Sequence, residues 1–145
     1  DEKQSGSPAV EEPERPMKAG TVASLIGGIL MLASAFAHAF LGWPAFEKEL
    51  SGAGVMRDVI GGLNVGWHFG SFAMFGFGAI VVFTAAKTLR GEYVTIVPAG
   101  IIAGLYIVFG LWALLFRGFS PHFLGFILKG LLASGILLRP RASRP

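Results

Sequence analysis

Three long stretches of this chain contain no charged residue, and they constrain its fold more than any other feature. They run between Lys18 and Glu47, between Asp58 and Lys87, and between Glu92 and Arg117. Each exceeds the roughly 20 residues that an α-helix needs to span a bilayer. Only 14% of the 145 residues are charged and 53% are hydrophobic, whereas soluble domains carry about 25% charged residues. The sequence therefore predicts an integral membrane protein.

Four apolar segments are predicted to span the membrane, at residues 19–41, 59–86, 93–116 and 121–138. Each should be a helix, because an apolar segment in lipid must satisfy its backbone hydrogen bonds internally. Ser120 is predicted to cap the last helix, with Pro121 at its first position. Pro98 falls in or near the first turn of the third helix, where proline is tolerated. The predicted fold is an all-α, four-helix transmembrane bundle.

Polar segments flank this predicted bundle. Residues 1–18 are acidic and contain prolines, so this extension is expected to be ordered only where a partner holds it. Residues 139–145 form a basic tail whose Arg139 and Arg141 are predicted to contact anionic lipid or a partner. Lysine and arginine are more frequent on the side of the two termini, which predicts that both termini are cytoplasmic. The outward connection, residues 43–58, is expected to contain a short interfacial turn.

The segment GLNVGWHFGSFAMFGFGAI, residues 62–80, carries two stripes on the second predicted helix. Gly62, Gly66 and Gly70 are four residues apart and therefore line one face. Small residues at this spacing allow another helix to approach closely in lipid. The sequence predicts that this glycine stripe packs against a neighbouring helix.

The second stripe, on nearly the opposite face, consists of Asn64, His68 and Ser71. His68 is either a buried histidine bonded to a neighbouring helix, a ligand to haem or chlorophyll, or part of a proton relay or metal site. Asn64 belongs to the same candidate cofactor face. His38, near the end of the first helix, is a candidate to ligate one haem jointly with His68. The depths of the three histidines argue against a single shared metal ion.

Lys129 lies about 12 Å into the last predicted helix, with His122 and Gly125 on the same face. No Asp or Glu occurs inside any predicted span. Lys129 either snorkels, is satisfied by carbonyl groups, is neutral, or meets a carboxylate, a lipid phosphate or a cofactor propionate from elsewhere. The sequence predicts that Lys129 and His122 contact a partner or a lipid.

Several function classes find no support in the residues. There is no cysteine, which excludes disulfides and thiolate chemistry. No phosphate-binding loop, nucleophile elbow or H-E-x-x-H motif is present, so the chain is not expected to be an enzyme. The net charge of +3 suits the flanks of a membrane protein, and no nucleic-acid partner is predicted.

The four spans, the short connections, HAFLGW at the end of the first helix and GWHFGS in the second resemble small four-helix proteins of the bacterial inner membrane of the DoxX-like kind. The resemblance covers about residues 19–138 and implies a multi-pass protein of that membrane. It supplies no catalytic residue. The acidic N-terminal extension is not part of the pattern.

Three functions are compatible with this sequence. The leading hypothesis is a non-catalytic accessory or structural subunit of a larger membrane complex, such as a respiratory or photosynthetic one. The second is a redox or pigment protein that binds haem or chlorophyll through His68 and His38. The third is a small transporter, which is disfavoured because the sequence has no inverted repeats or broken helices.

Overall fold

The computed structural model describes residues 15–138, with the side chains of residues 19–138. The predictions for the N-terminal extension before Arg15, and for Arg139 and Arg141, concern residues outside this range. The described residues form helices and connections without any strand. The helices are α1 (Arg15–Ala37), the π-helix η1 (His38–Gly42), α2 (Trp43–Gly52), α3 (Arg57–Leu89), α4 (Val97–Arg117), α5 (Pro121–Ser134) and the 3-10 helix η2 (Gly135–Leu138).

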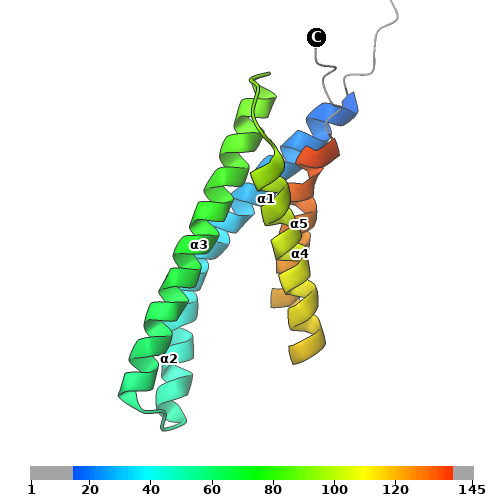
Figure 1. Cartoon of the computed structure of the whole chain (residues 1–145). Helices are drawn as coiled ribbons and strands as arrows, with labels where there is room; N and C mark the ends of the chain where they lie inside the picture. Colours follow the sequence, from blue (N-terminus) through cyan, green and yellow to red (C-terminus); the bar gives the residue numbers. More distant parts are fainter. Residues whose placement is uncertain (1–14, 139–145) are drawn as a thin grey trace, which may run out of the picture.

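Four helical segments are long and apolar enough to cross a bilayer, as the sequence predicts. Ser120 caps α5 by accepting a hydrogen bond from the backbone N–H of His122 at 3.3 Å. Pro98 lies in the first turn of α4. The described ends of the chain, at Arg15 and Leu138, lie at the same end of the molecule (Figure 1). The fold is therefore an all-α, four-helix membrane bundle.

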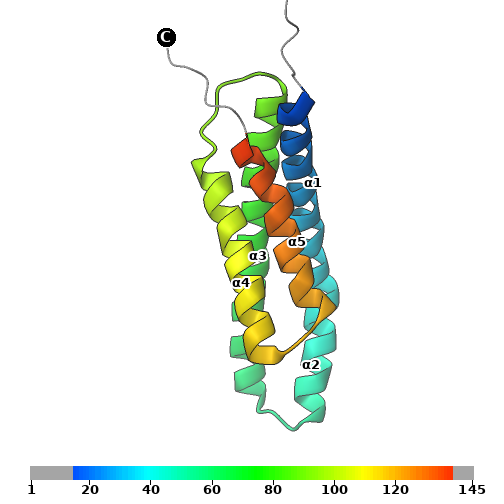
Figure 2. The ribbon, with the colours of Figure 1, turned by 90° about the vertical axis from the view of Figure 1, so that its right-hand side faces the viewer.

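The first hairpin is longer than the second, because the predicted interfacial turn is instead helical. α2 continues from α1 through η1, so the first span is one rod over 34 residues, Ala19–Gly52, and α3 has 33 residues. At 1.5 Å per residue each is about 50 Å long, against about 30 Å of bilayer hydrocarbon. Figure 2 shows α2 and the adjoining end of α3 extending past the α4–α5 connection. Pro44 stands directly after the π-turn of η1, and the wider turn accommodates a residue that has no backbone N–H to donate.

Helix α1 holds the bundle together by contacting both α3 and α5. The tightest pairs are α1 with α3 and α4 with α5, whereas α3 contacts α4 much less. The two hairpins therefore meet along α1 and diverge on the α3–α4 side (Figure 1). The buried core lies among the helices and consists of Met31, Val81, Ala99, Ile102, Ala103, Tyr106, Phe126, Ala133 and Ile136.

Glycines set the closest approaches between these helices. A Cβ atom placed on Gly78 would lie 2.9 Å from the backbone nitrogen of Leu32 on α1. A Cβ on Gly27 would lie 2.8 Å from the backbone nitrogen of Ala133 on α5, and one on Gly130 would lie 2.8 Å from the carbonyl oxygen of Ala103 on α4. Because backbone atoms cannot turn aside as a flexible side chain can, the helices touch through these glycines.

The glycine stripe predicted from the sequence is not among these contacts. A Cβ on Gly62, Gly66 or Gly70 would meet no atom within 4 Å. The stripe therefore packs against no helix in the described part of the chain. Gly78, on a different face of α3, makes the close contact with α1 instead. The physical reason is that α3 turns its polar stripe, not its smooth face, toward α1, as its contacts below show.

Gly78→Ala should destabilise the bundle, because α1 and α3 must separate to admit the methyl group. Overpacking of this kind costs about 1–3 kcal/mol. Gly66→Ala, on the same helix but in open space, should be neutral or stabilise by up to about 1 kcal/mol through helix propensity. Thermal unfolding of both variants in the same detergent measures the difference. Equal shifts would show that Gly78 does not set the α1–α3 spacing.

Candidate functional site

Three polar side chains join η1 to α3: His38, Trp67 and Ser71. His38 Nδ1 lies 2.8 Å from Ser71 Oγ, and Trp67 Nε1 donates to the carbonyl oxygen of His38 at 2.7 Å. The imidazole and indole rings stack, with their centroids 4.1 Å apart and their planes 6° from parallel. The stack and the two hydrogen bonds hold the imidazole in one orientation.

The hydrogen-bond network also assigns a tautomer to His38. Ser71 Oγ donates its own hydrogen to the carbonyl oxygen of Trp67 at 3.0 Å. It can therefore only accept from His38, so Nδ1 is the donor. In the neutral ring Nε2 is then the unprotonated nitrogen, and it has no hydrogen-bond partner among the described residues.

The local helix geometry makes this cluster possible. In η1 the backbone N–H of Trp43 bonds to the carbonyl oxygen of His38, one residue further along than in an α-helix. That carbonyl also receives the indole N–H of Trp67. A Cβ on Gly42 would lie 2.9 Å from the Trp67 ring. The absence of a side chain at Gly42 therefore lets the indole lie against the π-turn.

A cavity of about 360 Å³ adjoins this cluster between α1, η1, α3 and α5, and we call it the Lys129 cavity. Lys129 is only 8% exposed, and its ammonium group donates to Ser34 Oγ at 2.8 Å. The same Nζ atom lies 4.6 Å from the ring centroid of Phe126 and 5.9 Å from that of Tyr106. Of the interpretations that the sequence leaves open, snorkelling is therefore wrong, because Lys129 points into the bundle. His122, at the exposed start of α5, also lines the cavity.

A second hollow lies between α3 and α4, where the hairpins diverge. This α3–α4 groove has a volume of about 370 Å³ and is lined by Gly70 and Phe77 from α3 and by Leu105 and Tyr106 from α4, among others. Tyr106 is 4% exposed, and its hydroxyl group has no hydrogen-bond partner among the described residues. The glycine stripe thus runs into this groove at Gly70.

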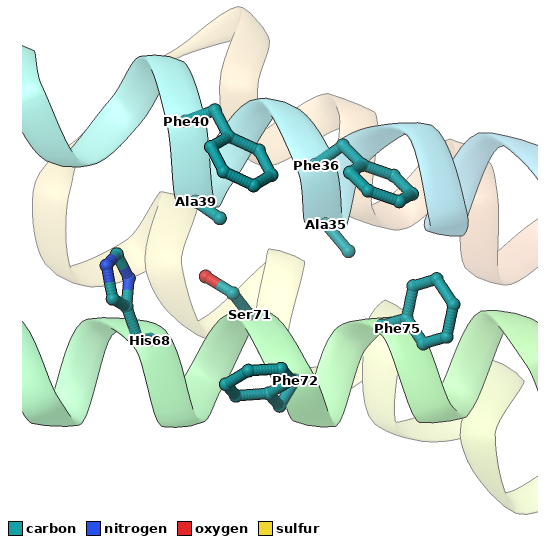
Figure 3. A pocket seen from close by; sticks show the side chains of 8 residues that line it. All are labelled: Ala35, Phe36, Ala39, Phe40, His68, Ser71, Phe72 and Phe75. Atoms are coloured by element: carbon teal, nitrogen blue, oxygen red, sulfur yellow. The ribbon is translucent and has the colours of Figure 1, made fainter.

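Figure 3 shows a third hollow, an apolar groove of about 530 Å³ between α1 and α3. His68 lies at one end of it, and the aromatic lining consists of Phe36, Phe40, Phe72 and Phe75. His68 Nδ1 is buried and has no hydrogen-bond partner among the described residues. Asn64 is half-buried and lines none of the three hollows.

The two candidate haem ligands are not brought to one cavity. His38 lines the Lys129 cavity and the α3–α4 groove, whereas His68 lines the phenylalanine groove of Figure 3. Histidines that bind metal usually donate their other ring N–H to an acceptor, which His68 Nδ1 lacks here. We therefore do not propose a shared haem. Within residues 15–138, no three His, Asp or Glu side chains are grouped so as to hold a metal ion.

The acidic residues of the described chain all lie away from Lys129. They are Glu47, Glu49, Asp58 and Glu92, and none lines any of the three hollows. Glu92, in the α3–α4 connection, is paired with Lys87 at 2.9 Å. The hydrogen bond from Lys87 lowers the pKa of the Glu92 carboxyl group. The lining of the Lys129 cavity thus contains a lysine and no carboxylate of residues 15–138.

The sequence singles out His38, His68, His122 and Lys129, but it gives no role to several residues that complete these sites. Ser34 has a usable signal, because it lies four residues before His38 and therefore on the same helix face. Tyr106 has none, since a tyrosine in an apolar span is also common as simple packing.

The fold defines the class of the protein: a multi-pass, all-α membrane protein whose spans contact lipid. No family model, curated protein or solved structure matches the chain. The resemblance to DoxX-like proteins therefore rests on the spans and short motifs quoted above, and function has to be argued from the sites.

Ser71→Ala should destabilise the protein by about 1–3 kcal/mol, because it leaves the Nδ1 donor of His38 without an acceptor inside the bundle. Ser134→Ala is the matched control, since its hydroxyl group bonds only to the carbonyl oxygen of Leu131 in its own helix. The control should stay within about 0.5 kcal/mol of the wild type. Thermal unfolding followed by tryptophan fluorescence measures both. A control that loses as much stability as Ser71→Ala would contradict the role given to the cluster.

Proposed function

We propose that this protein is a non-catalytic accessory subunit of a larger complex in a bacterial inner membrane, and that it binds a transmembrane helix of another subunit through α3. The observation that carries the proposal is the open glycine stripe. A Cβ atom on Gly62, Gly66 or Gly70 would meet no atom of another helix within 4 Å, although small residues at this spacing usually pack against a second helix in lipid.

The composition of the other faces of α3 argues for a helix rather than lipid on this stripe. Phe72, on another face of the helix, is 77% exposed, so a bulky side chain already faces outward there. A glycine costs about 1 kcal/mol relative to alanine inside a helix. A close contact that the missing side chain permits offsets this cost.

The α3–α4 groove supplies a second, independent argument. The buried hydroxyl group of Tyr106 lacks a partner among the described residues, and such groups are normally hydrogen-bonded. A helix seated on Gly70 and between the diverging hairpins would bring its own polar groups to this groove. A transmembrane helix of another subunit would therefore satisfy both the stripe and the tyrosine.

Gly66→Leu should abolish recovery of the partner subunit after mild solubilisation, because the new side chain fills the contact surface. Gly104→Leu is the control: Gly104 also lies in open space but belongs to α4 and not to the glycine stripe of α3. A photo-crosslinking residue at position 66 should capture the same partner, which mass spectrometry identifies. A crosslink to a second copy of this chain, or unchanged recovery with Gly66→Leu, would overturn the proposal.

We also propose that both termini lie in the cytoplasm, on the basis of the lysine and arginine distribution. The chain has no cysteine, so single cysteines report cleanly. Ser51 lies at the exposed end of α2. Tyr93, which is 92% exposed, lies in the α3–α4 connection. A membrane-impermeant maleimide on intact cells should label Ser51→Cys but not Tyr93→Cys. The reverse pattern would invert the orientation.

A further inference from the structure

The ammonium group in the Lys129 cavity has no counter-charge in the part of the chain that the structure describes. Among the described residues, the only hydrogen-bond acceptor of the Lys129 ammonium group is the neutral hydroxyl group of Ser34, at 2.8 Å. An ammonium group has three donors, so two remain. The aromatic faces of Phe126 and Tyr106 attract the cation but provide no negative charge. An anion is therefore the class of ligand that would supply both the missing hydrogen-bond acceptors and the counter-charge.

Other groups that line the cavity also favour an anionic ligand. Both ring nitrogens of His122 lack hydrogen-bond partners among the described residues, so the N–H of this ring is available to an anion. The first turn of α5, with Pro121 and His122, also lines the cavity. The N-terminal end of a helix carries a partial positive charge. No carboxylate of the described chain competes for these positions.

The cavity is large enough for a headgroup, and part of its wall is apolar. Its volume is about 360 Å³, and Ala37, Met74 and Phe126 form part of its wall. A charge attracts its partner far more strongly here than in water, because the surrounding dielectric constant is low. We propose that the Lys129 cavity binds one oxyanion, a carboxylate or a phosphate, and that Lys129 pairs with it while His122 stands at the entrance.

This ligand chemistry has two sources, a membrane amphiphile with an anionic headgroup or a small soluble anion. Gly62, Gly66 and Gly70 do not line the Lys129 cavity, whereas His38, Met74 and Phe126 line both this cavity and the α3–α4 groove. The two proposals therefore rest on different key residues, Lys129 for the anion and Gly66 for the partner helix. Variants at Lys129 report on the anion, and variants at Gly66 report on the partner helix.

The test uses the full-length protein, purified and freed of lipid in a neutral detergent, and titrated with three probes by calorimetry. The probes are oleate, its uncharged analogue oleyl alcohol, and inorganic phosphate. We expect one oleate to bind per chain and oleyl alcohol to bind at least about tenfold more weakly. Phosphate that displaces oleate assigns the site to soluble anions as well, whereas oleate binding unaffected by phosphate assigns it to amphiphiles.

Three variants complete the experiment. Lys129→Met removes the charge at similar length and should weaken oleate binding at least about tenfold, whereas Lys48→Met, an exposed lysine of α2, should leave it unchanged. Ser34→Ala removes the neutral acceptor that competes for the ammonium group, so it should retain or strengthen binding. This variant keeps the test decisive even where Lys129→Met fails to fold. Equal binding of oleate and oleyl alcohol, unchanged affinity in Lys129→Met, or weaker binding in Ser34→Ala overturns the proposal.

Discussion

The close approach of backbone to backbone along α1 is the constraint on which the rest of this structure depends. In lipid no water is released when apolar side chains meet, so helices associate only where their surfaces fit. Gly28 admits Val81 and Val82 of α3, and Gly27 admits the backbone of α5. These neighbouring glycines point in different directions around α1, and they determine that α1 is the helix shared by both hairpins. The divergence of α3 from α4 follows, because neither helix has a partner of this kind in the other.

That divergence also explains where the polar groups gather. A fully closed bundle would bury His38, Lys129 and Tyr106 among aliphatic side chains, at a cost of several kcal/mol for each unpaired group. Here the open side and the long first hairpin leave hollows beside each of them. His38 is held by a stack and two hydrogen bonds contributed by α3. The same geometry that limits packing thus creates the sites.

The sequence predicts the spans, the Ser120 cap and the class of fold, because these depend on local composition and on capping chemistry alone. It also predicts two opposed stripes on α3, since helical spacing determines which residues share a face. It does not predict which stripe meets α1, because that depends on glycines in another helix. The continuation of α1 through η1 into α2 is missed for a similar reason. The π-turn is favoured by the contact of Trp67 with Gly42, 25 positions earlier in the chain, which no local pattern reveals.

Lys129 illustrates how a charge can be retained in the membrane while remaining available to a ligand. A lysine at the centre of a transmembrane helix costs about 2.5–3.5 kcal/mol on insertion scales. A hydrogen bond from a charged group contributes about 1.5–3 kcal/mol, and a cation over an aromatic face contributes about 0.5–2 kcal/mol. Ser34 and Phe126 together therefore offset the insertion cost. On these magnitudes the fold does not depend on an anion, and the binding energy of the proposed anion would come from pairing with the ammonium group rather than from the rescue of a buried charge.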